Sequence, residues 1–354
     1  MSWQKWGCLN YYRQCVCVWL CFIMDTHSNY SNLISIENLF QAWNEFRKGK
    51  SKRLDVQIFE RNLEDNLFNL HERLKNKTYR HGGYQSFYVQ DPKQRHIHKA
   101  RVADRIVHHL IYTFLYKLFD NSFIYDSYSC RLDKGTHKGV KRLKQFARKI
   151  SQNHTQSCWA LKCDIKKFFA SVDHGILLNL LGKKIKDKNI IWLLRQIIDS
   201  FQTESDKGIP LGNLTSQIFA NIYLNELDQF IKRKMKVSYY LRYADDFIFL
   251  SESKECLPQY INELKKFLLN KLTLELHPKK IIVRRLDNGI DFLGYIVLPH
   301  YILPRTKTKR RMFKKLEEKV GQKNFNQSLQ SYLGYLGHAN AFKLSKDLKN
   351  HFSM

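Results

Sequence analysis

Apolar residues recur every three or four positions along much of this 354-residue chain, with polar residues between them. This spacing gathers the apolar side chains on one face and is typical of amphipathic helices. It predicts helices over residues 35–77, 102–118, 176–201, 215–233 and 257–272, and a helical segment from Pro304 to the end of the chain.

Shorter apolar or alternating stretches predict strands instead. They cover residues 84–90, 159–165, 239–250 (a hairpin), 280–285 and 291–297. The segment PKQRHI (92–97) is expected to lead into the helix at 102, and GIPLGN (208–213) to form a turn. One antiparallel β unit among many helices makes the fold class α+β.

The beginning of the chain differs from the rest. The run CVCVWLCFIM (15–24) resembles a weak signal peptide, but no small-residue cleavage site follows it. Met24 is an alternative start, which would leave residues 1–23 outside the natural product. We therefore expect residues 1–34 to be a disordered or non-native leader.

The charge balance indicates a polyanionic partner. The chain has 60 Lys and Arg against 32 Asp and Glu, a formal net charge of +28, spread along its whole length. Nucleic acid fits this surface better than an anionic membrane, and no segment has the ~20 apolar residues of a membrane span. The 8 Cys form no CxxC pair, which favours reduced thiols in a cytoplasmic protein.

Two adjacent carboxylates, Asp245 and Asp246, interrupt the apolar run YYLRYADDFIFL (239–250). They suit an ordinary hairpin turn, or a cation site, because neighbouring carboxylates repel each other unless a cation holds them. Asp164, in LKCDIKKFFASVDH (161–174), ends a predicted strand and is either a strand-end Asp or a third ligand. Three carboxylates on neighbouring strands would suit two Mg²⁺ ions ~3.5–4 Å apart, with Mn²⁺ as a substitute.

The order DIKKFF, LGNLTSQ, YADDF, LHPKK and FLGY resembles the reverse transcriptases of retroelements. The resemblance covers about residues 79–295, and a weaker similarity continues to residue 341. It implies RNA-directed DNA polymerase activity and a right-hand polymerase fold. The implied parts are N-terminal helices and fingers over 35–158, a palm with a finger insertion over 159–300, and a basic helical thumb over 301–354.

The same resemblance implies roles for single residues. Asp164 and Asp245 would bind the catalytic metals directly, and Asp246 would be more peripheral. Phe169 resembles the bulky ring that collides with a ribose 2′-OH, with a core role as the alternative. Lys280 resembles the basic residue that protonates the leaving pyrophosphate.

Further basic positions are less specific. Lys93 and Arg95 resemble the finger residues that grip the incoming triphosphate, with solvated loop charges as the alternative. Lys279 is a close rival of Lys280 for the proton donor.

Two stretches resemble one branch of the family, the reverse transcriptases of diversity-generating retroelements. In IPLGNLTSQ (209–217), Leu211 and Gln217 replace the Gln and Pro of group II intron enzymes, and Gly212 lies between them at the implied dNTP site. SYSCRLDKGTH (127–137) is also similar to that branch. The resemblance implies copying of a template-repeat RNA into cDNA with errors opposite template adenines, for transfer to a target gene. A small basic ring-forming accessory protein would be a partner besides template RNA, primer and dNTPs.

We hypothesise that Leu211 lowers fidelity, because this turn lies beneath the templating base pair in the family's fold and Leu cannot donate or accept hydrogen bonds there. A packing change without effect is the alternative. Other readings of the whole chain are a stand-alone group II intron-like, CRISPR-linked or phage-defence reverse transcriptase, or a non-catalytic nucleic-acid-binding protein with a polymerase fold.

Overall fold

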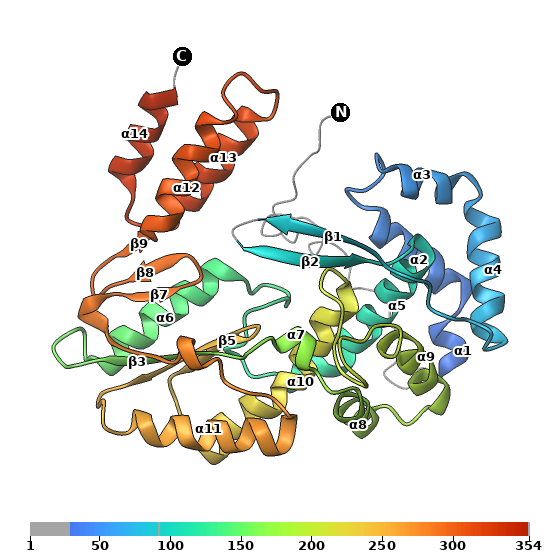
Figure 1. Cartoon of the computed structure of the whole chain (residues 1–354), viewed down its shortest axis with the longest axis horizontal. Helices are drawn as coiled ribbons and strands as arrows, with labels where there is room; N and C mark the ends of the chain where they lie inside the picture. Colours follow the sequence, from blue (N-terminus) through green and yellow to red (C-terminus); the bar gives the residue numbers. More distant parts are fainter. Residues whose placement is uncertain (1–28, 91–92, 353–354) are drawn as a thin grey trace.

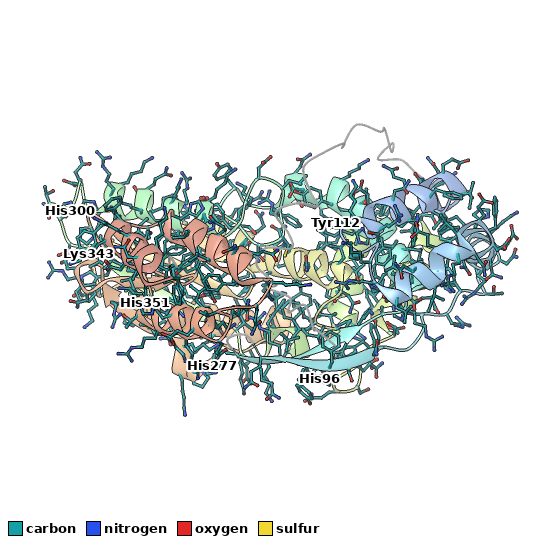
Figure 2. The ribbon with its side chains drawn as sticks, turned by 90° about the horizontal axis from the view of Figure 1, so that it is seen from above. His96, Tyr112, His277, His300, Lys343 and His351 are labelled. Atoms are coloured by element: carbon teal, nitrogen blue, oxygen red, sulfur yellow. The ribbon has the colours of Figure 1, made fainter. Side chains whose placement is uncertain are left out.

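The protein, seen here as a computed structural model, is described for residues 29–90 and 93–352, so most of the expected leader lies outside the described residues (Figure 1). Helices and small antiparallel sheets are mixed along the chain, as the α+β prediction required. In Figure 2, Tyr112 lies toward one end of the long axis, and His300, Lys343 and His351 lie toward the other. Within the part of the chain that the structure describes, no helix is both long and apolar enough to cross a bilayer.

The described chain opens with four helices, α1 (Tyr30–Leu33), α2 (Ile36–Arg47), α3 (Leu54–Arg61) and α4 (Leu63–Lys75). The helical segment predicted over 35–77 is therefore divided. One interruption falls at the polar residues 48–53, where Gly49 has a left-handed φ of 67°, and the other at Asn62, between α3 and α4. The apolar faces of these helices share a core with α5 (Val102–Phe119), which is buried on most sides.

An antiparallel ribbon of two strands, β1 (Gln85–Gln90) and β2 (Gln94–Lys99), reaches from these helices toward the middle of the molecule (Figure 1). The expectation that residues 92–97 only lead into a helix was wrong, since β2 begins at Gln94. Pairing with β1 explains the strand. Tyr88 lies opposite His96, and their rings stack with centroids 4.5 Å apart.

The central sheet has the antiparallel order β4-β5-β3-β6 and is built from β3 (Trp159–Asp164), β4 (Tyr240–Tyr243), β5 (Asp246–Ser251) and β6 (Ile282–Arg285). Successive residues of a strand point to opposite faces. Leu161 of β3 therefore joins the core formed with α10 (Leu214–Gln229) and α11 (Leu257–Leu272), while Ala160 joins the core formed with α6 (Thr136–Ile150). These helices lie on opposite sides of the sheet in Figure 1. Helix α6 was not among the predicted helices, although its buried residues Val140, Leu143, Phe146, Ala147 and Ile150 recur at helical spacing.

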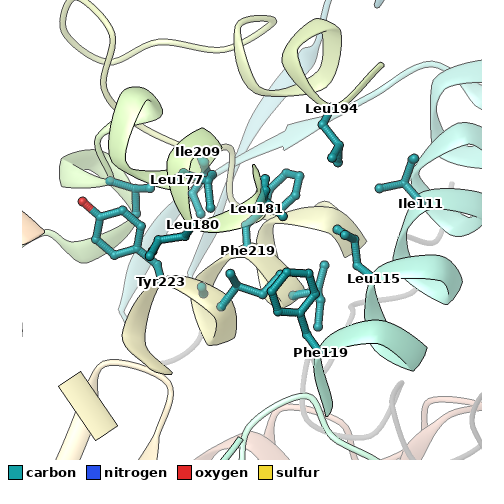
Figure 3. Close-up of a cluster of buried hydrophobic side chains, with 14 of the residues drawn as sticks. Ile111, Leu115, Phe119, Leu177, Leu180, Leu181, Leu194, Ile209, Phe219 and Tyr223 are labelled. Atoms are coloured by element: carbon teal, nitrogen blue, oxygen red, sulfur yellow. The ribbon is translucent and has the colours of Figure 1, made fainter. Parts of the chain in front are cut away.

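Between β3 and α10 the chain forms the helices α7 (Phe168–Ser171), α8 (His174–Lys184) and α9 (Lys188–Ile198). The single helix predicted over 176–201 is thus two, because Asp187 starts a new helix by accepting backbone hydrogen bonds at the N-terminus of α9. Figure 3 shows apolar side chains of α8 and α9, such as Leu181, gathered with those of α5 and α10, such as Leu115. This core fixes the position of the turn over residues 208–213.

The last part of the chain contains a small antiparallel sheet and three helices: β7 (Ile290–Phe292), β8 (Tyr295–Val297), β9 (Ile302–Pro304), α12 (Thr306–Glu317), α13 (Phe325–Leu336) and α14 (Phe342–Phe352). The helices stand together beyond the sheet in Figure 1, which confirms the helical segment expected after Pro304. The strand predicted at 291–297 is a hairpin. Leu293 and Gly294 form its turn with left-handed φ angles of 50° and 93°.

Candidate active site

Three aspartates lie at one end of two neighbouring strands. Asp164 is the last residue of β3 and lies opposite Asp246, the first residue of β5. Asp245 lies in the turn between β4 and β5, and its carbonyl O accepts a hydrogen bond from Ile165 N (3.3 Å). The expectation that neighbouring strands bring these three residues together is confirmed. Their role as metal ligands stays a prediction.

A lysine already contacts one of these carboxylates. Lys280 Nζ lies 2.6 Å from Asp164 Oδ1. It belongs to the short helix η3 (Pro278–Lys280), which is held beside β3 because His277 N donates to Asp164 O (2.8 Å). Lys279 is exposed. Of the two lysines that the sequence left open, Lys280 is therefore the one that contacts the aspartates.

Lys162 also contacts the site, although the sequence analysis did not include it. It lies two residues before Asp164 and so on the same face of β3. Its Nζ lies 3.1 Å from Asp246 Oδ2 and 3.1 Å from the carbonyl O of Asp291. Lys162 thus partly neutralises Asp246. The signal in the sequence was a charged residue inside an otherwise apolar strand.

Burial makes this carboxylate cluster electrostatically unfavourable. It raises the pKa of Asp245, and repulsion from Asp164 adds to the rise. Burial also raises the pKa of Asp246 to about 6, although Lys162 acts in the opposite direction. Asp246 Oδ1 is buried and has no hydrogen-bond partner. A bound cation would relieve each of these penalties, so the oxygen donors present fit a hard cation such as Mg²⁺.

Among the described residues, no three His, Cys, Asp or Glu side chains form a ready-made metal cage. Phosphoryl-transfer sites do not need one, because Mg²⁺ there is usually bound by one or two carboxylates together with substrate phosphates and water. The ends of β3 and β5 supply carboxylates for a site of that kind.

Asp246→Asn should stabilise the protein in EDTA at neutral pH. The pKa of Asp246 is about 6 in the folded state against an ordinary 3.8, so the folded protein favours the protonated carboxyl. The stability that Asp246 contributes is therefore fully present below pH 3.8 and is lost as the pH rises through 6. At pH 7.5 the ionised carboxylate costs on the order of 2 kcal/mol, which Asn avoids. We expect an unfolding temperature a few degrees higher at pH 7.5, with no gain near pH 4. The same change at the exposed Asp206 is the control, and a gain at Asp246 that does not depend on pH would contradict the argument.

The turn before α10 is joined to the ribbon. His98 N donates to Leu211 O (2.9 Å), and Asn213 Nδ2 donates to His98 O (2.8 Å). Gly212 has a φ of 104°, and a Cβ there would lie 2.7 Å from Ile97 Cγ2, so the close approach requires glycine. Leu211 and Gly212 are therefore fixed against β2.

Phe169 is attached to the same turn, because Ile209 N donates to Phe169 O (2.8 Å). Its ring is only partly buried, whereas Phe168 is 2% exposed and belongs to the core. Of these two adjacent rings, Phe169 is the one that a substrate can reach. Gln217 lies in the first turn of α10 and is half-buried.

Lys93 and Arg95 lie on or beside the start of β2, and both side chains are exposed. Burial raises the pKa of Asp245, and Arg95 is one of the positive charges that oppose this rise, so its guanidinium acts on the aspartate cluster. Figure 2 shows His96 of β2 on the same edge of the molecule as His277, whose backbone is bonded to that of Asp164. Arg95 therefore lies within electrostatic range of Asp245, while the structure gives no such link for Lys93.

A sequence model described as "Reverse transcriptase (RNA-dependent DNA polymerase)" matches residues 89–297, which is more than half of the chain. The chain belongs to the reverse transcriptase family. The matched region of this reverse transcriptase runs from the ribbon to β8, so it includes all three aspartates and the turn that carries Leu211.

Curated relatives place this domain near those of group II introns. The putative COX1/OXI3 intron 2 protein of Saccharomyces cerevisiae is 24% identical over 298 residues, and the group II intron-encoded protein LtrA of Lactococcus lactis is 24% identical over 303 residues. Each match covers 66% of this chain, but only 32% and 49% of those relatives, so the chain spans about half of their length or less.

A solved structure agrees on the fold. Apo telomerase from Candida tropicalis matches with a TM-score of 0.52 at 14% identity, over 72% of this chain and 54% of that chain. At this identity the likeness concerns the fold alone. Together with the family match, it gives this reverse transcriptase the right-hand polymerase fold.

Proposed function

We propose that this reverse transcriptase is an active RNA-directed DNA polymerase. The observation that carries the proposal is the meeting of Asp164, Asp245 and Asp246 at adjacent strand ends, with a raised pKa for the last two. A protein that only binds nucleic acid has no need of clustered, half-buried carboxylates in a chain of net charge +28. The site therefore favours catalysis over a purely binding role.

Asp164 and Asp245 would hold two Mg²⁺ ions, or Mn²⁺ in their place, and Asp246 would be more peripheral because Lys162 contacts one of its oxygens. When bound, these ions would activate the primer 3′-OH and neutralise charge on the transferred phosphate. Lys280, which contacts Asp164, would deliver a proton to the departing pyrophosphate.

The fingers ribbon and the turn would select the nucleotide. Arg95, with Lys93 nearby, offers N–H donors to the triphosphate, and the planar fork of arginine suits phosphate oxygens. Phe169 would exclude a ribose 2′-OH. Leu211, Gly212 and Gln217 would lie along the nascent base pair. The bonds from this turn to β2 support that placement.

We propose the fingers over residues 35–158, the palm over 159–300 and the thumb over 301–354. The thumb carries the run RTKTKRRMFKK (305–315), whose charges suit the phosphate backbones of template RNA and primer cDNA. Such contacts weaken steeply as salt is added.

We further propose that the enzyme belongs to a diversity-generating retroelement. It would copy a template-repeat RNA with errors opposite adenines, together with a small basic ring-forming accessory protein, for transfer of the cDNA to a target gene. The residues that support this are Leu211 and Gln217 and the stretch SYSCRLDKGTH (127–137). A cytoplasmic location would keep reduced the thiols that are free in the structure, Cys130, Cys158, Cys163 and Cys256.

A stand-alone group II intron-like reverse transcriptase is the second candidate. The similarity to LtrA and to the yeast intron protein favours it. The two candidates differ in fidelity, because an enzyme of the second kind has no reason to misread adenines selectively.

Leu211→Gln is expected to reduce errors opposite template adenines by about tenfold, which corresponds to ~1.4 kcal/mol of regained discrimination. The main chain of this residue is fixed by His98 N (2.9 Å), so the new amide would act from a defined position. Sequencing of cDNA made by wild-type and variant protein measures the change. Leu214→Gln, a half-buried leucine at the start of α10, is the matched control. Equal adenine errors in wild type and Leu211→Gln would contradict the fidelity hypothesis.

Primer extension on an RNA template tests the proposed function as a whole. The full-length protein is assayed with Mg²⁺, with and without its accessory protein, and the products are sequenced. Errors concentrated at template adenines would support the diversity-generating assignment. Accurate cDNA would support polymerase activity and favour the intron-like candidate. The absence of cDNA under all conditions would contradict both candidate functions.

A further inference from the structure

A fully buried ion pair lies directly behind the aspartate turn. Arg242 on β4 and Asp228 on α10 have 0% exposed side chains, and Arg242 Nη2 lies 2.6 Å from Asp228 Oδ2. Arg242 Nε also donates to Asp228 Oδ1 (2.8 Å), to which Tyr240 OH donates as well (2.6 Å). A buried ion pair of this kind is often no more stabilising than well-packed apolar residues. Its presence here therefore calls for a reason other than stability.

The other N–H groups of Arg242 reach three further parts of the chain. Nη2 donates to Ser127 Oγ (3.2 Å), and Nη1 donates to Asn221 Oδ1 (3.3 Å) and to the carbonyl O of Ala244 (3.1 Å). Ser127 begins the stretch SYSC, which runs beside β4 because Arg242 N donates to Asp126 O (2.9 Å). The guanidinium thus joins this stretch and α10 to the turn.

Ala244 is the residue that directs the chain into Asp245. Its φ is 53°, a left-handed value that residues other than glycine seldom adopt. The carbonyl that Arg242 contacts belongs to the peptide group between Ala244 and Asp245. The hydrogen bond therefore fixes the plane of the peptide group that precedes the Cα atom of Asp245, and with it the direction in which the Asp245 side chain leaves the main chain.

We infer that Arg242 is a positioning residue for Asp245. Its buried guanidinium holds the peptide between Ala244 and Asp245 in the orientation that presents the Asp245 carboxylate to the metal. The inference rests on the proposed metal-dependent function and deepens it. An ion pair with a purely structural role would need only Asp228, whereas here one N–H group extends from the pair to the turn itself.

Lysine cannot replace Arg242 in this role. Its single ammonium cannot reach Asp228 and the carbonyl of Ala244 together, whereas the rigid fork of arginine has N–H groups in both directions. Arg242→Lys therefore keeps the positive charge but loses the simultaneous contact with Asp228 and the carbonyl O of Ala244.

Metal affinity in the absence of nucleotide tests this inference. The measured quantity is the rise in unfolding temperature of the full chain with Mn²⁺ concentration, together with the Mg²⁺ concentration needed for half-maximal primer extension. Arg242→Lys is compared with the apolar set Arg242→Met, Asp228→Leu and Tyr240→Phe, which removes the buried charges without leaving one unpaired. Tyr240→Phe alone is the matched control, because it keeps the hydrogen bonds of Arg242 to Asp228 and to the carbonyl O of Ala244.

Both the lysine variant and the apolar set are expected to need about tenfold more Mn²⁺ and Mg²⁺, the usual effect of losing a residue that orients a metal ligand. The control should match the wild type. An apolar set that folds and keeps the wild-type metal dependence would overturn the role of Arg242. A double variant, Asp164→Asn with Asp245→Asn, separates this outcome from failure of the proposed function: if it still shows the wild-type Mn²⁺ response, the metal site itself is wrong.

A glycine variant keeps the test decisive even if the apolar set does not fold. Glycine adopts the φ of Ala244 without a steric penalty. If Arg242 acts through this turn, Ala244→Gly should restore most of the Mg²⁺ response in the Arg242→Lys background. No recovery in that double variant would overturn the inference.

Discussion

Asp245→Asn is expected to lower the rate of cDNA synthesis by at least about a thousandfold, or ~4 kcal/mol of transition-state stabilisation. Asn keeps the size of the side chain and removes the charge that a divalent cation requires. The fold should persist and be slightly more stable in EDTA at neutral pH, because burial raises the pKa of Asp245 and makes its ionised form the unfavourable one. Single-turnover primer extension and thermal unfolding on the same preparation measure both effects.

Asp206→Asn is the matched control for this prediction. It makes the same chemical change at an exposed aspartate whose left-handed φ of 56° asparagine also tolerates. We expect it to keep the wild-type rate. Activity of Asp245→Asn within tenfold of the wild type would contradict the role of this carboxylate as a metal ligand.

Local patterns in the sequence were sufficient for several elements whose hydrophobic period is uninterrupted, although α6, which has such a period, was missed. The apolar run around YADD predicted the hairpin of β4 and β5, and the spacing over 257–272 gave the bounds of α11. Strand β2 was not predicted, because QRHIHK has no strong pattern of its own and becomes a strand through pairing with β1. Helix boundaries inside 176–201 depended on a single capping residue, Asp187.

In the candidate site, too, some residues could be found from the sequence and others only from the fold. Its aspartates could be found from the sequence because each stands within a specific short motif. Lys162 and Arg242 could not be assigned roles in this way, because their partners lie far away in the chain: Asp246 for Lys162 and Asp228 for Arg242. Sequence motifs thus identify the groups that could do chemistry, whereas the residues that orient or neutralise them emerge only from the fold.

Phe169→Val is expected to raise the efficiency of ribonucleotide incorporation relative to deoxyribonucleotide by about a hundredfold, or ~3 kcal/mol of discrimination. The ring is partly exposed, and the backbone of Phe169 is held by Ile209 N (2.8 Å). The ring also packs edge-on against Phe168, with centroids 5.3 Å apart, and this contact limits its movement away from a 2′-OH. Valine still packs on the neighbouring core but is shorter, so the collision disappears while incorporation of dNTPs continues.

Single-nucleotide extension with matched dNTP and rNTP measures this ratio as kcat/KM for each sugar. Phe201→Val is the control: it shortens another partly buried ring of the segment between β3 and α10, one that packs on His98 with centroids 4.6 Å apart. We expect its ratio to equal that of the wild type. An unchanged ratio in Phe169→Val would assign this ring to the core, the alternative that the sequence left open.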